Sequence, residues 1–200
     1  MFALHYSLKH LLKIISRPGL YIFYGRPNSF KTKTAITLAL RSKRKTIYVG
    51  LAKHSFITCP RFFNSQNRFF KALNFREEIA TLLELEAVVD ERSLIIYDGF
   101  GSLVLPLYAY QRAHAIYSAS MLAAAFLHQI ADTRKSSVVV ITGEGARGRP
   151  LFYAVLRPYA HSYFHFLRGE DLVKIEFKGP GLSTITAFSA ETSVLLADLE

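Results

Sequence analysis

Cysteine is nearly absent from this sequence, and carboxylates are scarce. Cys59 is the only cysteine among 200 residues, which excludes a disulfide within the chain and fits a reducing interior. Asp and Glu number 15 against 25 Lys and Arg, so the chain carries a net charge of +10. This surplus favours a polyanionic partner, nucleic acid before membrane, although some cytoplasmic proteins are simply basic.

Long uninterrupted hydrophobic runs are also missing. Lysines and histidines interrupt the first 16 residues, which argues against a secretory signal. Residues 113–131 are long and apolar, but serines interrupt them and His114 and His128 lie near their ends. This pattern favours a buried helix over a membrane span. We therefore expect a cytoplasmic protein without a membrane segment.

Two patterns typical of catalytic or metal sites do not occur. The histidines show no ligand spacing with a cysteine, so zinc is not expected, and the sequence has no G-x-S-x-G nucleophile motif. Half of the residues are hydrophobic and only 20% are charged, which indicates a globular protein. The length predicts a single domain over residues 1–200.

Helical and strand patterns alternate along the chain and then give way to strands alone. Apolar spacing predicts helices at residues 4–16, 31–41, 76–89 and 110–131. Short apolar runs predict buried strands at 20–24, 46–51, 93–98 and 137–142, and β-rich stretches follow at 162–168, 172–178 and 183–189. The fold class is therefore α/β, with a mostly parallel sheet extended by a C-terminal antiparallel β-meander. Residues 60–73 fit no single pattern.

The stretch YGRPNSFKTKTA, residues 24–35, matches the phosphate-binding loop pattern G-x-x-x-x-G-K-[ST] except at one position. Gly25, Lys31 and Thr32 have the required spacing, but Phe30 stands where the second glycine belongs. A strand precedes the loop and a helix follows it, so backbone amides and the helix dipole would converge on phosphates. Asp98 ends the apolar run LIIYD, where a carboxylate helps to hold the magnesium of a bound nucleotide.

The phenyl ring of Phe30 leaves two interpretations of this loop. The ring either fills the phosphate pocket or swings out through a distorted loop, because glycine is what permits close backbone approach. In one interpretation Lys31 still pairs with phosphate and Thr32 ligates magnesium. In the other, both residues merely solvate the start of a helix, and the loop is a relic without a cofactor.

The order of the motifs resembles the RecA/RadA recombinase superfamily over essentially the whole chain. LKHLLKIISRPGLYIFYGRPNSFKT is followed by TIYVGL, LIIYD, a long helix, VVVITGEG and a closing β-meander. The sequence is most similar to the compact archaeal RadA paralogues of RadB type, and KaiC-like ATPases share the same core. The resemblance implies a leading amphipathic helix at 1–17, a RecA-like P-loop core at 18–142, and a DNA-facing loop with the meander at 143–200.

Family roles carried over to this chain imply a degenerate nucleotide site. Gly25, Lys31, Thr32 and Asp98 match nucleotide-binding positions, with Thr32 and Asp98 as magnesium ligands if Mg-ATP binds. The family's catalytic glutamate would fall in VGLAKH, residues 49–54, which holds no carboxylate. Glu144 stands where the family tends to place a glutamine that senses the γ-phosphate, and an unpaired carboxylate there would repel a triphosphate. The resemblance therefore implies an ATPase fold with weak or no hydrolysis.

A second family feature is a DNA-binding loop after the fourth strand, which matches GEGARGRPLFY, residues 143–153. Arg147 and Arg149 lie among glycines and would pair with phosphates, while Phe152 and Tyr153 would stack on exposed bases. The alternative is a solvent-facing loop with incidental arginines. The other loop that the family uses, 99–112, carries only Arg112 and is a weaker candidate.

Two further basic stretches have simpler interpretations. RSKRK, residues 41–45, follows a helix, where cations stabilise the C-terminus. PRFFNSQNRFFK, residues 60–71, suits single-strand binding, but its paired phenylalanines at seven-residue spacing favour one helix face packed on a core or a partner subunit.

Three hypotheses follow. In the first, the chain is a recombinase paralogue that binds DNA, preferably single-stranded, and assists a RadA-type recombinase in homologous recombination and DNA repair. It would form homo- or hetero-oligomers with a recombinase or another paralogue through residues 4–16 and 60–75. In the second, it is an active RadB- or KaiC-type ATPase that tolerates Phe30. In the third, it is a structural subunit whose charge is screened by an acidic partner.

Overall fold

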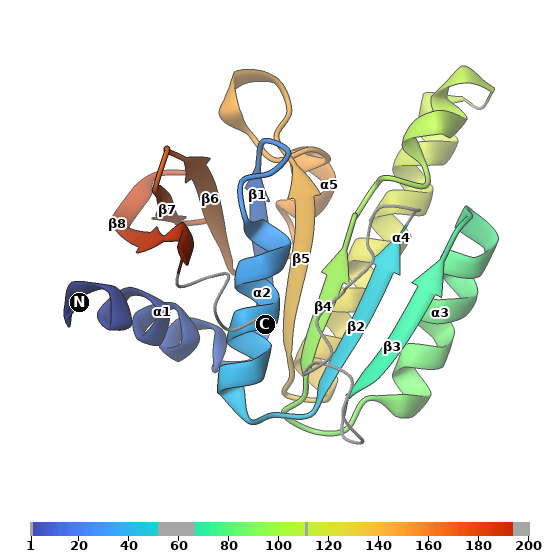
Figure 1. Cartoon of the computed structure of the whole chain (residues 1–200). Helices are drawn as coiled ribbons and strands as arrows, with labels where there is room; N and C mark the ends of the chain where they lie inside the picture. Colours follow the sequence, from blue (N-terminus) through green and yellow to red (C-terminus); the bar gives the residue numbers. More distant parts are fainter. Residues whose placement is uncertain (1, 52–66, 111, 194–200) are drawn as a thin grey trace.

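The computed structural model describes residues 2–51, 67–110 and 112–193 and shows three layers (Figure 1). An eight-stranded sheet forms the middle layer. Helices α1 (Phe2–Ile15) and α2 (Lys31–Ser42) cover one face, and α3 (Phe75–Val88), α4 (Ala113–Thr133) and the short α5 (Tyr153–Leu156) cover the other. Each face of the sheet therefore buries its own hydrophobic cluster.

The strands are β1 (Gly19–Gly25), β2 (Thr46–Leu51), β3 (Arg68–Ala72), β4 (Leu94–Asp98), β5 (Ser137–Gly143), β6 (Ser162–Arg168), β7 (Leu172–Lys178) and β8 (Thr184–Glu191). Their order in the sheet is β3-β2-β4-β5-β1-β6-β7-β8. The first six are mutually parallel, and β6, β7 and β8 pair antiparallel. This confirms the predicted α/β class with a mostly parallel sheet and an antiparallel C-terminal extension.

The strand order places β5 between β1 and β4. The carboxyl ends of these three parallel strands therefore meet at one edge of the sheet, although their sequences lie far apart. We call this edge the carboxyl edge, and the opposite edge, where the parallel strands begin, the amino edge. The loop after β1 and the aspartate that ends β4 are brought together across the end of β5.

The long apolar stretch forms α4, which begins at Ala113 rather than at residue 110. A 3₁₀ helix, η2 (Leu105–Ala109), with Pro106 in its first turn, precedes it, and the extended backbone of Arg112, with ψ of 135°, sets the start of α4. The buried residues of α4, such as Ala123, Ala124 and Leu127, pack on the sheet. Within the described ranges, no helix is both long and apolar enough to cross a membrane.

The prediction that the paired phenylalanines of residues 60–71 share one helix face is wrong for the residues that the structure describes. Residues 68–72 form β3, in which successive side chains point to opposite faces of the sheet. The ring of Phe69 accordingly stacks on Tyr48, 5.5 Å between centroids, whereas Phe70 packs against the cluster on the other face. Phe62 and Phe63 lie outside the described residues.

Helix α3 begins with a reciprocal cap. The side chain of Asn74 accepts a hydrogen bond from the amide of Glu77, and Glu77 in turn accepts one from the amide of Leu73. The next residue, Glu78, is only 3% exposed and accepts a 2.6 Å hydrogen bond from the hydroxyl of Tyr97 on β4. Burial raises the pKa of Glu78, and the bond from Tyr97 opposes that rise.

Replacing Tyr97 by phenylalanine is expected to destabilise the fold by about 1–3 kcal/mol at neutral pH, because it removes the donor of a buried carboxylate. The pKa of Glu78 would rise further, and a carboxyl group with a raised pKa loses its stabilising contribution as the pH climbs through that pKa. The loss of stability caused by Tyr97→Phe should therefore be smaller near pH 4.5, the ordinary pKa of a glutamate side chain. Urea unfolding at both pH values measures this; an equal loss at both would contradict a charged Glu78.

Candidate functional site

A cavity of about 320 Å³ lies at the carboxyl edge, between the loop after β1 and the ends of β4 and β5. Four residues that the sequence predicts for nucleotide binding, Gly25, Lys31, Thr32 and Asp98, all line it. The rest of its wall is formed by Pro27, Leu51, Gly99, Phe100, Ser102, Leu105, Ile141, Thr142, Gly143 and Leu151. The structure therefore brings the predicted nucleotide residues together.

The loop between β1 and α2 wraps around the ammonium group of Lys31. The Nζ atom donates hydrogen bonds to the carbonyls of Gly25 and Arg26, at 2.9 and 2.8 Å, and to the hydroxyl of Ser29 at 3.2 Å. Gly25 allows this tight turn, because a Cβ there would lie 2.4 Å from the carbonyl oxygen of Phe166. A cation is thus held in the centre of the loop.

Phe30 adopts a backbone conformation that glycine favours. Its φ of 66° and ψ of 14° lie in the left-handed region, at a cost of about 1 kcal/mol for a residue with a side chain. This turn points the chain into α2, whose first internal hydrogen bond runs from the amide of Thr34 to the carbonyl of Phe30. The amides of residues 31–33 precede that bond, so the positive end of the helix dipole faces the loop.

The phenyl ring of Phe30 lies outside the cavity. It is half-buried against the cluster between α1, α2 and the sheet. The guanidinium of Arg168 lies 5.6 Å from the ring centroid and the ammonium of Lys33 lies 5.2 Å from it, so the ring has cation–π contacts with two cations. The ring of Phe30 therefore does not fill the phosphate pocket. It swings out, and the left-handed backbone accommodates it.

Thr32 and Asp98 are joined directly. The Oγ1 of Thr32 donates a 2.9 Å hydrogen bond to Asp98 Oδ2, and the hydroxyl of Tyr48 donates a 2.6 Å bond to the same oxygen. Burial raises the pKa of Asp98, while these two bonds and the charge of Lys31 oppose the rise. Sequence reasoning missed Tyr48; the signal was a tyrosine inside a buried strand, where its hydroxyl needs a partner.

The charge of Lys31 depends on its surroundings. Burial lowers the pKa of its ammonium group to about 8, although the carboxylates of Asp98 and Glu144 act in the opposite direction. Lys31 is therefore charged at neutral pH and loses its proton as the pH rises through about 8. A bound phosphate would favour the charged form and draw a proton to Lys31 in that range.

The residues present fit a magnesium-bound nucleotide. Mg²⁺ in nucleotide sites takes one or two protein oxygens together with phosphate oxygens and water. Thr32 Oγ1 and Asp98 Oδ2 supply such a pair, and no group of three His, Cys, Asp or Glu side chains in the described residues offers a complete metal site by itself. The hydroxyl of Ser102 is buried in the same wall without a hydrogen-bond partner in the structure.

Glu144, which follows β5, lies close to a histidine on β6. Its Oε2 lies 3.4 Å from the Nε2 of His165, which is stacked on Tyr24, 4.5 Å between centroids. The other ring nitrogen of His165 lies 3.6 Å from the carboxylate of Glu176. Glu144 lines a second hollow of about 590 Å³ on the β6 side of the loop, and its buried Oε2 has no hydrogen-bond partner in the structure. The repulsion of a triphosphate by this carboxylate therefore stays a prediction.

Few groups in the described wall of the cavity could activate water. Asp98 is the only carboxylate among the residues that line the cavity, and Thr32 and Tyr48 both bond to it. The sequence from Thr46 to Arg76 contains no Asp or Glu at all. A general base must lie within hydrogen-bond reach of the proton that it removes. Asp98 is thus the one carboxylate of the described cavity wall that could act as a base, and Thr32 and Tyr48 already occupy one of its oxygens.

The predicted DNA-binding residues separate into two groups. Arg147 and Arg149 are exposed on the loop after β5, where residues 146–148 form a 3₁₀ turn. Tyr153 instead packs inward, with its hydroxyl donating to the carbonyl of Pro180 at 3.2 Å and the guanidinium of Arg149 over its ring at 5.6 Å. Phe152 lies edge-on to Phe100. Both rings therefore have partners within the chain, and one of these partners is the exposed Arg149 itself.

Comparison with known proteins does not name a family. No protein-family model matches the sequence, and no curated protein matches it significantly.

Replacing Phe30 by glycine tests where the ring lies. We expect the affinity for a non-hydrolysable ATP analogue with Mg²⁺ to stay within about threefold of wild type, because the ring is outside the cavity and glycine adopts the same φ. Calorimetric titration of both proteins measures it. Binding that appears only in the glycine variant, or that strengthens at least tenfold, would place the ring in the phosphate site.

Proposed function

We propose that this chain is a RecA/RadA-type recombinase paralogue that binds Mg-ATP and hydrolyses it slowly or not at all. In this proposal it binds DNA, single-stranded before duplex, and assists a RadA-type recombinase in homologous recombination and repair. The observation that carries the proposal is the loop geometry: Lys31 in the centre of a loop with a glycine-like turn at Phe30, and Thr32 bonded to Asp98.

The loop supports phosphate binding through three groups that act on the same anion. Lys31 supplies a charge, the amides at the start of α2 supply directed donors, and the helix dipole adds a partial positive charge. Thr32 and Asp98 supply oxygens on the side where Mg²⁺ would bridge the phosphates. The hollow beside Arg26 and Pro27, on the other side of the loop, has room for the nucleoside.

The scarcity of possible bases in the described cavity wall favours slow turnover. A bound nucleotide would then act as a structural ligand that holds one conformation, rather than as a consumed substrate. Apolar side chains are exposed at the same carboxyl edge: Leu73 after β3, Leu105 in η2 and Tyr110, which is 86% exposed. This edge suits contact with a recombinase or another paralogue subunit, which could place a carboxylate beside the nucleotide.

The proposed DNA loop is physically connected to the nucleotide site. Residues 141–143 at the end of β5 line the cavity, and the loop with Arg147 and Arg149 follows directly. Leu151 closes the loop by donating its amide to the carbonyl of Gly143 at 2.9 Å, and its side chain lines the same cavity. A nucleotide in the cavity would therefore contact both ends of the loop that presents the arginines.

The nucleotide proposal predicts saturable binding of Mg²⁺ with a non-hydrolysable ATP analogue. Lys31→Ala should weaken it at least tenfold, because a hydrogen bond to a charged group contributes about 1.5–3 kcal/mol. Lys33→Ala is the matched control, since the Lys33 ammonium lies by the Phe30 ring outside the cavity. Calorimetry measures the affinities, and phosphate release from ATP measures the turnover.

Equal affinities of the two lysine variants would contradict the nucleotide site, and so would the absence of heat with the wild-type protein. Rapid ATP turnover by the isolated chain would contradict the proposed slow hydrolysis and favour the active ATPase of RadB or KaiC type.

The DNA proposal predicts that Arg147→Ala/Arg149→Ala weakens binding to a single-stranded oligonucleotide. Each lost phosphate contact should lower the slope of log affinity against log salt by roughly 0.7 for a single strand. Fluorescence anisotropy at several salt concentrations measures this, with Lys9→Ala/Arg76→Ala, two exposed cations elsewhere, as the control. If both double variants lose the same affinity, the loop has no specific role.

A further inference from the structure

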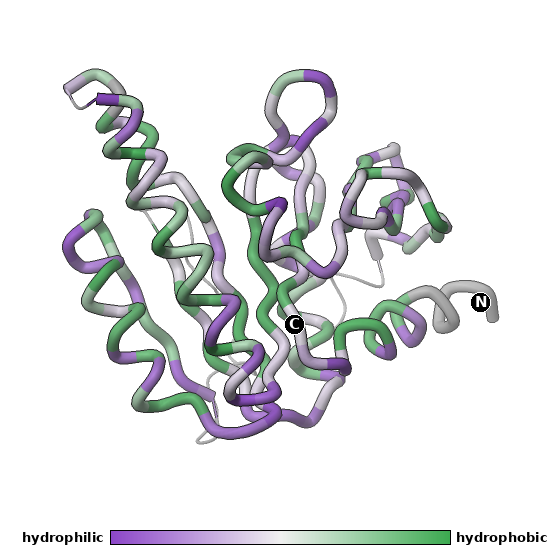
Figure 2. The backbone as a smooth tube through the Cα atoms, turned by 180° about the vertical axis from the view of Figure 1, so that it is seen from behind, coloured by the Kyte–Doolittle hydropathy of each residue, from purple (hydrophilic) through white to green (hydrophobic). Residues whose placement is uncertain are grey.

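The amino edge of the parallel sheet carries a second concentration of positive charge. The connections that enter β1, β2, β4, β5 and β6 are residues 16–18, 43–45, 89–93, 134–136 and 157–161. They hold two carboxylates, Asp90, which forms a salt bridge with Lys45, and Glu91. Against these stand eight cations, Arg17, Lys43, Arg44, Lys45, Arg92, Arg134, Lys135 and Arg157. Figure 2 shows hydrophilic segments along this lower edge, where helices turn into strands.

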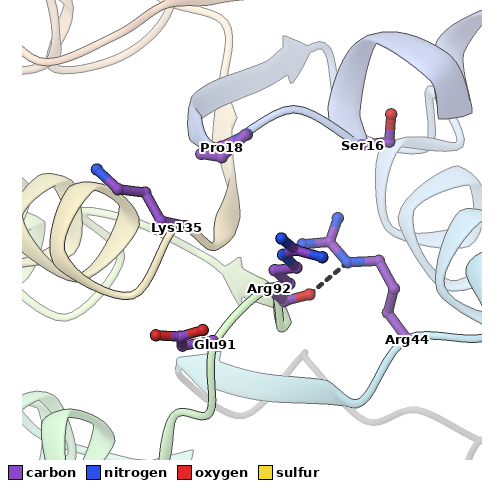
Figure 3. A pocket seen from close by; sticks show the side chains of 6 residues that line it. All are labelled: Ser16, Pro18, Arg44, Glu91, Arg92 and Lys135. Atoms are coloured by element: carbon purple, nitrogen blue, oxygen red, sulfur yellow. Dashed lines mark hydrogen bonds between the residues drawn. The ribbon is translucent and has the colours of Figure 1, made fainter.

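A hollow of about 510 Å³ opens within this edge (Figure 3). Arg44, Arg92 and Lys135, together with Ser16, Pro18 and Glu91, line it. These side chains come from four different connections, so the fold and not the local sequence brings them together. In Figure 3 the carboxylate of Glu91 points away from the two guanidinium groups. The hollow therefore has cationic walls with little internal neutralisation.

Hydrogen bonds to uncharged acceptors hold the guanidinium of Arg44 in the wall of the hollow. Its Nε donates to the carbonyl of Arg92 at 2.5 Å, and its Nη2 donates to the carbonyl of Ser93 at 2.7 Å. Its Nη1 donates to the hydroxyl of Ser137 at 3.0 Å. None of these acceptors is a carboxylate, so the bonds orient the guanidinium without cancelling its charge. The sequence interpretation of RSKRK as helix-end stabilisation omitted this inter-strand role.

The remaining cations of the hollow are exposed. Arg92 and Lys135 lie at left-handed backbone positions, with φ of 59° and 48°, at tight turns that lead into β4 and β5. Lys135 has a long 3.5 Å contact with the exposed carboxylate of Asp132, which is worth little in water. Helix C-termini at this edge add about half a negative charge each, which offsets only part of the eight cations.

We propose that the amino edge binds the sugar–phosphate backbone of a nucleic acid, with one phosphate in the hollow between Arg44, Arg92 and Lys135. The starts of five adjacent strands, about 4.8 Å apart, span roughly 20 Å. Each strand of a DNA duplex places a phosphate about every 3.4 Å along the helix axis, so roughly six phosphates cover that length. Basic residues on all five connections match such a row better than a single small anion.

This surface is separate from the nucleotide cavity and from the loop with Arg147 and Arg149. Those lie at the carboxyl edge, one strand length away, and strands of five to seven residues extend roughly 20 Å. The inference rests on neither of them. It goes beyond the proposed function because it gives the chain nucleic-acid contacts at two opposite edges, which would allow it to hold two segments at once.

The double variant Arg92→Asn/Lys135→Asn tests the proposal while keeping the turns, since asparagine tolerates the left-handed conformation. Its affinity for a labelled single-stranded oligonucleotide should fall about five- to tenfold at low salt, with a shallower salt dependence. Lys9→Asn/Arg76→Asn is the charge-matched control and should lose much less. Arg92→Lys/Lys135→Arg should bind within about twofold of wild type, because both charges remain. Thermal unfolding checks that every variant is folded.

The outcomes separate this surface from the other sites. A loss in the amino-edge variant that adds to that of Arg147→Ala/Arg149→Ala supports two independent contacts, whatever Lys31→Ala does to nucleotide binding. A loss no larger than that of the control overturns the proposal. Poly-glutamate that competes as well as the oligonucleotide at equal charge would also overturn it, in favour of an acidic polypeptide.

Discussion

The buried carboxylate of Asp98 is the point on which the candidate site depends. It is only 7% exposed, and a charge in that position is stable only while donors surround it. Thr32 from α2 and Tyr48 from β2 supply those donors, and Lys31 adds its charge nearby. One carboxylate thereby fixes the start of α2 against two strands. In the proposed function the same oxygens and charges bind a magnesium-bound phosphate, so one set of groups would serve both the fold and the ligand.

Phe30 shows that the left-handed backbone of this loop can form without the glycine that favours it. A glycine would reach φ of 66° without strain, and the phenylalanine pays about 1 kcal/mol for it. Partial burial of the ring and its cation–π contacts with Arg168 and Lys33 offset that cost. The loop therefore depends on contacts made by a strand of the meander, which an ordinary glycine loop would not need.

Much of the fold could be predicted, because periodicity reports which side of an element is buried. The helices and strands of the α/β pattern and the antiparallel extension were recognisable, and the spacing of Gly25, Lys31, Thr32 and Asp98 indicated their site. Strand β3 was missed because the adjacent Phe69 and Phe70 are both apolar. Each packs on a different face of the sheet, so the sequence shows no alternation of apolar and polar residues there. The partners of Tyr48, Glu144 and Arg44 could not be predicted, since each lies on another strand or connection that only the strand order brings close.

The central position of β1 has a consequence for how the chain is synthesised. β1 lies between β5 and β6, so Tyr24 meets Thr142 on one side and His165 on the other. More than a hundred residues must leave the ribosome before either neighbour exists. Pairings of such long sequence separation form slowly, because the entropy of closing the intervening chain is lost first. The loop that holds Lys31 is thus among the first segments made and among the last to reach its final surroundings. The apolar strand β1 stays unpaired in the interval, when an exposed strand edge is prone to aggregation.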